Sequence, residues 1–173
     1  RKDKSGKKVP YATPPGPSEL IGTPVLYDGK VYCAIGQDPE HGDGVGRLSC
    51  IDAKTGKVLW KNTDIGRTIS TVSVADDLVY LAEYAGIVHC LDAKTGKVYW
   101  THDSFSRIWG STLVVDGKLL LGNEDGDLLI LDHGKKKPKV QMVGMGAPVY
   151  SSPVFVNGTL YIATQTHLYA IGK

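Results

Sequence analysis

Four side chains that could bind a cation lie close together in the glycine-rich stretch 36–44. They are Asp38, Glu40, His41 and Asp43. Carboxylate oxygens are preferred ligands of calcium, and imidazole is a common ligand of other divalent metals. The spacing does not match an EF-hand loop, and acidic side chains in a glycine-rich loop are commonly just solvated. The sequence therefore leaves a cation site and a solvated loop as alternatives, and favours the solvated loop.

A second group of side chains could bind an anionic ligand. Arg67 and Arg107 are 40 residues apart, which is the period of the repeat described below. They could form a basic rim for an anion, or they could form ion pairs between neighbouring units. Trp109 replaces Ile69 at the same repeat position, where an aromatic ring could line a ligand site or plug a channel. With Glu83 from a neighbouring variable loop, these residues make a candidate ligand-binding site, and no catalytic residue is assigned.

The cysteine pattern excludes several kinds of site. The three cysteines, Cys33, Cys50 and Cys90, form no Cys-x-x-Cys motif. A zinc ribbon, a thioredoxin-type motif and a covalently attached c-type haem all lack their signature. Because Cys50 and Cys90 occupy the same place in two repeats, we expect small apolar strand residues rather than a disulfide pair.

Composition narrows the class of protein. The chain has 173 residues, of which 42% are hydrophobic and 22% charged, with a formal net charge of +2. These values are typical of a folded globular protein and not of a disordered one. No apolar stretch approaches the roughly 20 residues of a membrane-spanning helix. The small net charge gives no argument for nucleic acid as a partner.

An internal repeat organises the elements that position these side chains. Residues 50–60 read CIDAKTGKVLW and residues 90–100 read CLDAKTGKVYW, identical at nine of eleven positions. A degenerate copy starts at residue 130, and the beginning of another is found at residue 170. A second element, with a hairpin signature, precedes each copy, at 22–32, 70–80, 110–120 and 151–161. Repetition at this period indicates stacked supersecondary units.

Each repeat predicts four strands. Two β-branched or aromatic runs flank an Asp-Gly or similar pair, which favours a tight hairpin turn with positive φ. A third strand, the turn Ala-Lys-Thr-Gly-Lys and a fourth strand follow. Four antiparallel strands in about 40 residues predict an all-β fold, a β-propeller of four-stranded antiparallel blades, with about 3.5 to 4 blades present. The expected divisions are an extended, basic and Pro-rich segment at 1–21 and blades at 22–67, 68–107, 108–148 and, incomplete, 149–173.

The residues that recur in the repeat have expected structural roles. The tryptophans should fill the space between neighbouring blades, the aspartates should accept hydrogen bonds from the turn backbone, and the glycines should adopt a left-handed conformation. These residues are Asp52, Gly56, Trp60, Asp92, Gly96 and Trp100.

The pattern Asp-x-x-Thr-Gly-x-x-x-Trp at 52–60 and 92–100 resembles the PQQ-like propeller repeat of quinoprotein and BamB-like proteins. The resemblance covers most of the chain and suggests a C-terminal fragment of a bacterial, planctomycete-type member. It implies a periplasmic or extracellular location. Quinoproteins of this family bind PQQ at the propeller axis with calcium, an Asp base and commonly a ring formed by adjacent cysteines. No cysteines are adjacent here, so we expect no cofactor; PQQ and calcium would require a complete propeller.

Chain direction separates two faces of such a propeller. The repeated hairpin turns share one face, and the variable loops share the other, where function is expected to concentrate. The favoured hypothesis is a non-catalytic module that acts as a scaffold or as a protein- or ligand-binding surface within a larger secreted or periplasmic protein. The alternative is part of a PQQ-dependent quinoprotein oxidoreductase. Expected partners are the remaining blades of a parent protein or a second copy, with no nucleic acid and no membrane span; residues 9–13 could supply the missing outermost strand.

Overall fold

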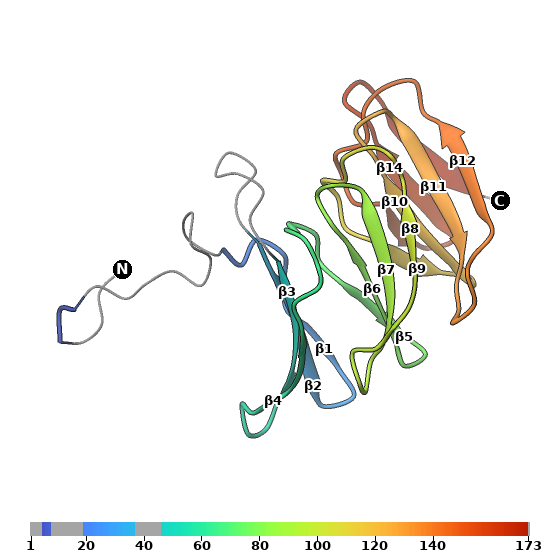
Figure 1. Ribbon diagram of the computed structural model, residues 1–173. Coiled ribbons are helices and arrows are strands. Elements are labelled where there is room, and N and C mark those ends of the chain that lie inside the picture. Colours follow the sequence, from blue (N-terminus) through green and yellow to red (C-terminus); the bar gives the residue numbers. More distant parts are fainter. Residues whose placement is uncertain (1–4, 8–18, 37–45, 173) are drawn as a thin grey trace.

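The computed structural model describes residues 5–7, 19–36 and 46–172, which fold into four antiparallel sheets (Figure 1). The first sheet contains β1 (Val25–Tyr27), β2 (Lys30–Ile35), β3 (Arg47–Asp52) and β4 (Val58–Asn62). The second contains β5 (Ser73–Ala75), β6 (Leu78–Ala82), β7 (Ile87–Asp92) and β8 (Val98–Asp103). The third contains β9 (Leu113–Val115), β10 (Lys118–Gly122), β11 (Asp127–Asp132) and β12 (Val140–Gly144). The fourth contains β13 (Val154–Val156), β14 (Thr159–Ala163) and β15 (Leu168–Gly172).

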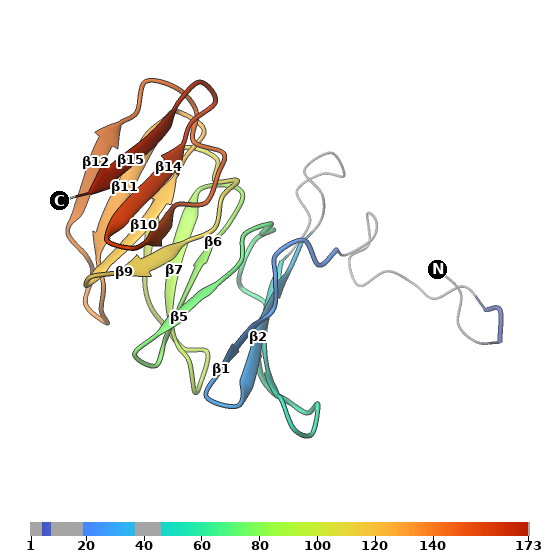
Figure 2. The same cartoon turned by 180° about the vertical axis from the view of Figure 1, so that it is seen from behind.

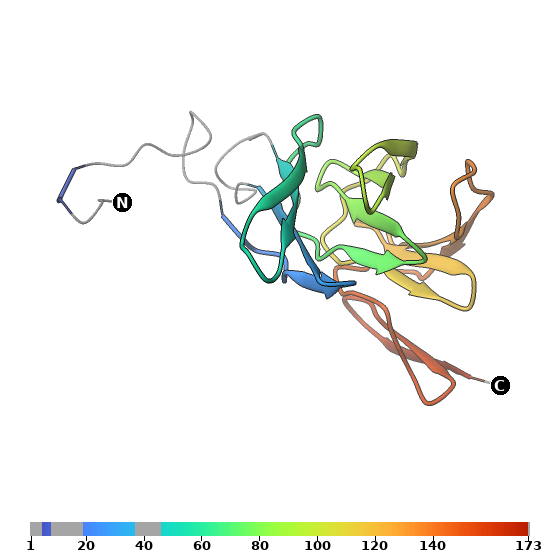
Figure 3. The same cartoon turned by 90° about the horizontal axis from the view of Figure 1, so that it is seen from below.

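The predicted all-β propeller architecture is confirmed. Each sheet is a meander in which consecutive strands pair, and we call the four sheets the first to the fourth blade. Figure 3 shows them side by side, splayed like the blades of a fan. The first strands β1, β5 and β9 contact one another in sequence and lie on the near side of Figure 2. They are therefore the innermost strands. Within the described residues, no helix is long and apolar enough to cross a membrane.

The first turn of every blade has the expected positive-φ geometry. Asp28 and Gly29 have φ of 46° and 68°, and Asn157 and Gly158 have φ of 49° and 76°. Two positive φ angles in a two-residue loop define a primed turn, whose twist matches that of the flanking strands. The second blade reaches the same geometry without glycine, because its turn residues, Asp76 and Asp77, are of a type that tolerates this region.

The repeated tryptophans and tyrosines join one blade to the next. Trp60 Nε1 and Tyr32 Oη both donate to the carbonyl oxygen of Ala93, each at 3.0 Å. Trp100 Nε1 donates to Gly134 O at 2.8 Å in the same way. A Cβ on Gly96 would lie 2.5 Å from the Trp60 ring, so this glycine is required by close packing as well as by its φ of 71°.

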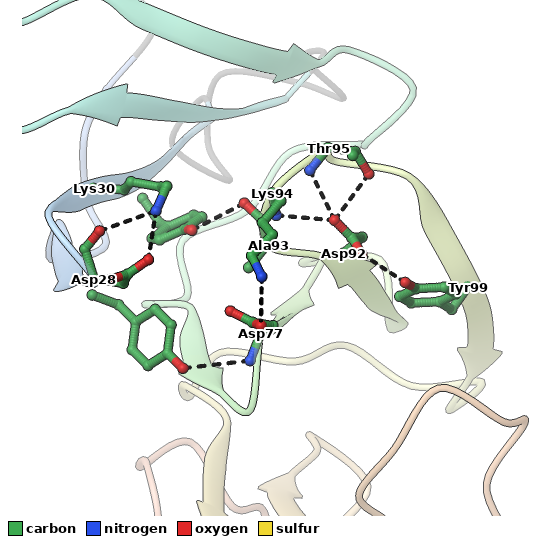
Figure 4. Close-up of polar contacts among 10 residues, drawn as sticks. Asp28, Lys30, Asp77, Asp92, Ala93, Lys94, Thr95 and Tyr99 are labelled. Atoms are coloured by element: carbon green, nitrogen blue, oxygen red, sulfur yellow. Dashed lines mark hydrogen bonds and ion pairs between the residues drawn. The ribbon is translucent and has the colours of Figure 1, made fainter.

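The repeated aspartates close the second turn of the first two blades. Asp92 Oδ1 accepts hydrogen bonds from the backbone amides of Lys94 and Thr95 and from the Thr95 hydroxyl, and Tyr99 donates to Oδ2 (Figure 4). Asp52 caps its own turn similarly. The Tyr99 hydrogen bond, followed by those of the turn, holds the Asp92 pKa below its ordinary value.

A belt of hydroxyl groups, not anticipated from the sequence, links the segments that precede the inner strands. The backbone amide of Thr23 donates to Thr71 Oγ1, that of Thr71 to Ser111 Oγ, and that of Ser111 to Ser152 Oγ, at 2.9, 2.9 and 2.8 Å. Each repeat has Ser or Thr at this position, so periodicity was the signal that could have revealed it. The belt satisfies amides that have no strand partner.

The two terminal blades expose apolar surface that the inner blades bury. Leu168 in β15 is 71% exposed, whereas Val88 and Leu128, at the same repeat position in the second and third blades, are 0% and 3% exposed. On the first blade, a hollow of about 530 Å³ is lined by β3 and β4, including Ile51 and Leu59. Both surfaces are where a further blade would pack if the fan continued.

Candidate functional site

The variable loops gather on one side of the fan, opposite the hairpin turns; we call this the loop face and the opposite side the turn face. Two backbone hydrogen bonds place the two predicted arginines on it. Tyr84 N donates to Arg67 O at 2.9 Å, and Glu124 N donates to Arg107 O at 2.8 Å. Each arginine therefore sits where the connection between two blades meets a turn of the following blade, which explains their equal spacing.

The structure brings both arginines to one aromatic ring. Arg67 Cζ lies 4.4 Å from the centroid of the Tyr84 ring, and Arg107 Cζ lies 5.5 Å from it. Trp109 packs edge-on against Tyr84 at 5.0 Å and against Tyr150 at 5.8 Å between centroids. We call these five residues the Tyr84 cluster. Guanidinium groups are attracted to the faces of aromatic rings, so the arrangement holds two cations within a rigid apolar frame.

The cluster has one accessible cation and one buried one. The side chain of Arg107 is 60% exposed, and its Nη1 lies 3.9 Å from Glu124 Oε2, a distant ion pair. Arg67 is only 8% exposed. Trp109 Nε1 donates to Glu124 Oε2 at a long 3.4 Å, and Trp109 lies in the loop that precedes β9. Arg107 is therefore the group best placed to meet a ligand.

Glu83 lies near the cluster but is engaged elsewhere. Its Oε1 accepts a hydrogen bond from Gly66 N at 2.8 Å and lies 2.6 Å from His89 Nε2. Glu83 and His89 are 8% and 5% exposed, and His89 Nδ1 is buried without a hydrogen-bond partner. The Gly66 hydrogen bond ties the second blade to the connection that comes from the first blade, and the His89 contact lies within the second blade. The geometry therefore gives Glu83 a structural contact, beside the binding role that the sequence predicts.

Phe105 is the most exposed large apolar side chain on the loop face, at 89%. Its φ of 56° is unusual for an aromatic residue. The backbone is held there because Asp103 Oδ1 accepts from Phe105 N at 2.7 Å and Ser104 Oγ donates to Ser106 O at 2.8 Å. These hydrogen bonds hold the backbone, and the Phe105 side chain presents an apolar ring to the solvent.

The predicted cation site at Asp38, Glu40, His41 and Asp43 lies outside the described residues, as does the segment 9–13. Among the residues that are described, no group of three or more His, Cys, Asp or Glu side chains is arranged to hold a metal ion. All three cysteines are free, and Cys50 and Cys90 are buried strand residues, as the sequence predicted for these two. Burial raises the pKa of the Cys90 thiol to about 11, which disfavours the nucleophilic thiolate.

Sequence reasoning identified part of this site. Arg67, Arg107 and Trp109 do come together, as their repeat positions indicated. Tyr84 and Tyr150 were missed, although each departs from the repeat as clearly as Trp109 does. Phe105 was missed because no periodic signal marks an exposed residue in a variable loop.

Comparison with known proteins agrees with this architecture. The family model described as outer membrane protein assembly factor BamB matches residues 44–172. No curated protein sequence matches the chain. BamB from Moraxella catarrhalis has a similar structure, with a TM-score of 0.66 at 17% identity over 93% of this chain. The quinohemoprotein alcohol dehydrogenase from Comamonas testosteroni gives a TM-score of 0.68 at 20% identity over 84% of this chain. The computationally designed Ika4 protein gives 0.67 at 15% identity over 86%.

The matches differ in how much of the other protein they cover. This chain spans 61% of the BamB structure and 29% of the dehydrogenase, but 89% of Ika4. At these identities the similarity is one of fold alone. The family model matches most of the chain, and the repeat motif, the hairpin turns and the interblade tryptophans are consistent with it. The chain belongs to the PQQ-like, BamB-type family of β-propeller repeat proteins.

Proposed function

We propose that this chain is a non-catalytic propeller module that binds a protein or ligand on its loop face. The Tyr84 cluster is the observation that supports it. Two guanidinium groups held against one tyrosine, flanked by Trp109 and Tyr150, offer cations and flat apolar surface in one place. Binding surfaces of this composition, rich in Arg, Tyr and Trp, are those in which a few residues supply most of the affinity.

Carboxylate ligands fit this site, because Arg107 is accessible and its guanidinium can donate two parallel hydrogen bonds. The test is a thermal-shift screen against aromatic and aliphatic carboxylates and a short Glu-rich peptide. At least one should raise the melting temperature, and Arg107→Gln should weaken that ligand roughly tenfold, the usual loss for a charged hydrogen bond. Lys61→Gln, an exposed cation on β4, is the matched control. A response that Arg107→Gln leaves unchanged would exclude the cluster as the site.

We further propose that the module works within a larger assembly, with the remaining blades of a parent protein or a second copy covering its ends. The exposed Leu168 on the fourth blade and the hollow on the first blade support this. The mass of the chain in solution is compared with that of the intact gene product. A dimeric chain identifies a second copy as the partner, and a longer gene product identifies the remaining blades of a parent protein. A wholly monomeric chain whose Leu168→Gln variant has unchanged solubility would contradict both. A periplasmic or extracellular location is proposed from the family and can be tested by cell fractionation.

The alternative is part of a PQQ-dependent oxidoreductase, favoured by the similarity to the quinohemoprotein dehydrogenase fold. The described residues do not fit PQQ with calcium, because they provide no cluster of metal-ligating side chains and no adjacent cysteines. Adding PQQ and calcium to the intact protein should therefore change neither its stability nor the cofactor spectrum. A spectral change with dye reduction would favour the enzyme.

A further inference from the structure

The second turn of the third blade departs from the otherwise uniform turn face. In the first two blades this turn is Ala-Lys-Thr-Gly-Lys, whereas the third blade has His-Gly-Lys-Lys-Lys-Pro-Lys at 133–139. The turn is longer: Asp92 N donates to Lys97 O, but Asp132 N donates to Lys139 O. The β-bulge that accompanies the short turn between β7 and β8 is not found between β11 and β12. The repeat supplies an internal reference, so the propeller scaffold does not require this difference.

The turn also loses the aspartate cap that closes its counterparts. Asp92 Oδ1 caps its own turn, but Asp132 Oδ1 accepts from Lys118 Nζ at 2.6 Å instead. The base of the turn is nevertheless fixed to the second blade. Gly134 N donates to Tyr80 Oη at 2.9 Å, and Tyr80 Oη lies 2.7 Å from His133 Nδ1. The base of the turn is therefore held in place, and the turn joins the lower ends of β11 and β12 in Figure 1.

Positive charge on the turn face is concentrated at this turn. On the hairpin turns of the first two blades, five lysines are balanced by five aspartates; these are Lys30, Lys54, Lys57, Lys94, Lys97, Asp28, Asp52, Asp76, Asp77 and Asp92. On the third blade, five lysines face two aspartates; these are Lys118, Lys135, Lys136, Lys137, Lys139, Asp116 and Asp132. The excess is local and cannot be explained by the small net charge of the chain.

The lysines of the longer turn lack anionic partners. Lys30, Lys94 and Lys118 each form an ion pair with an aspartate. Across the described part of the chain, no carboxylate lies within ion-pair distance of the four lysines at 135–139. Lys135 Nζ lies over the Tyr99 ring, 5.4 Å from its centroid. The turn encloses a hollow of about 520 Å³ lined by residues 132–139.

We propose that the turn at 133–139 binds phosphate groups that are displayed close together, as on an anionic lipid surface or along a polyphosphate chain. Lysine ammonium groups bind phosphate as point charges, and four of them on one short turn suit an array better than a single ion. No Phe, Tyr or Trp lies among residues 133–139, and the His133 ring already packs against Tyr80, so the turn offers no free stacking platform of the kind found in single-stranded nucleic-acid sites. This inference concerns the turn face and is independent of the loop-face function.

The repeat offers a precise test. Replacing residues 133–139 with Ala-Lys-Thr-Gly-Lys grafts a turn that this fold already forms twice, and it removes two lysines. Binding to vesicles of phosphatidylcholine with an equal part of phosphatidylglycerol, measured by co-sedimentation, should fall roughly 30-fold, the effect expected when two lysines leave an anionic surface. A parallel arm measures long-chain inorganic polyphosphate by fluorescence anisotropy. The arm in which binding is found identifies the source of the phosphate groups, lipid or polyphosphate. Raising the salt concentration should weaken that binding.

Charge-matched variants separate a local site from general attraction. Lys136→Glu and Lys61→Glu change the net charge equally, but Lys61 lies on β4, away from the turn. Of the two variants, only Lys136→Glu should bind more weakly, by at least tenfold. Far-ultraviolet circular dichroism should show that the grafted protein is folded. The proposal is overturned if wild-type protein binds neither probe, if both variants lose binding equally, or if single-stranded DNA binds more tightly than both probes. If the graft does not fold, the comparison of Lys136→Glu with Lys61→Glu still tests the proposal.

Discussion

Replacing Glu83 with Leu tests whether this carboxylate serves the scaffold or the ligand site. Its Oε1 accepts from Gly66 N at 2.8 Å and lies 2.6 Å from His89 Nε2. Glu83→Leu leaves the buried His89 Nε2 and the partly buried Gly66 amide without this carboxylate as a hydrogen-bond partner. An unsatisfied buried polar group costs about 1–3 kcal/mol and a partly buried one costs less, so the two together should lower the free energy of unfolding by about 3 kcal/mol. For a chain of this length that corresponds to a fall in melting temperature of roughly 10 °C.

A double-mutant cycle sharpens this test. Leu129, at the repeat position of His89, is fully buried, so His89→Leu imports a side chain that the fold accepts. The pair Glu83→Leu with His89→Leu leaves only the Gly66 amide unsatisfied, and it should lose about 1–2 kcal/mol less than the sum of the single variants. Unfolding in urea, followed by circular dichroism, measures each corner of the cycle.

The control is Glu124→Leu, which removes a carboxylate from the equivalent turn of the third blade. The Glu124 side chain is 32% exposed and holds only long contacts, so we expect a loss of less than about 1 kcal/mol. The reasoning would be refuted if Glu83→Leu unfolded like the wild type while weakening the carboxylate ligand. Additive losses in the cycle would equally show that Glu83 and His89 do not act as a pair.

Three further changes test other parts of the structure. Ser111→Ala removes the acceptor of the Thr71 amide and should cost about 1–2 kcal/mol in urea unfolding, and no loss would show that the hydroxyl belt is dispensable. In native protein at pH 8, a disulfide reagent should modify Cys33 before Cys90, because burial raises the Cys90 pKa to about 11; equal rates would contradict this. Asp92 has its pKa lowered chiefly by the Tyr99 hydroxyl, so its contribution is present above the ordinary value of 3.8 and is lost as the pH falls through the folded-state pKa. Asp92→Asn should therefore flatten the loss of melting temperature in acid, and an unchanged acid slope would refute the assignment.

The fold was predictable because the turns that define it are specified by neighbouring residues and are repeated along the chain. Asp28-Gly29 specifies a primed turn by the φ angles its residues tolerate, and Asp52 with Thr55 specifies a capped turn by hydrogen bonds within four residues. The 40-residue period then orders these units without any knowledge of long-range contacts. Even the equivalent backbone positions of Arg67 and Arg107 follow from the period.

The limits of sequence reasoning are visible at Glu83 and Phe105. Glu83 was grouped with the arginines because it lies in a variable loop, but its direction depends on Gly66 and His89, which come from other elements. Phe105 is exposed because hydrogen bonds of Asp103 and Ser104 hold its backbone at a positive φ. Neither set of contacts recurs in the other repeats, so the repeat pattern could not predict them.

By itself, the sequence determined the class of fold, the blade period, the turn chemistry and the two faces of the fan, since these depend on short-range propensities that recur in every copy. Tertiary structure alone decided which departures from the repeat act together. Tyr84 meets both arginines because successive blades place their loops side by side. The lysines at 135–139 form no ion pair within the described residues, and Asp132, the aspartate of their own turn, accepts from Lys118 instead. Such contacts join residues from different repeats, and their distances are set by the packing of one blade on the next.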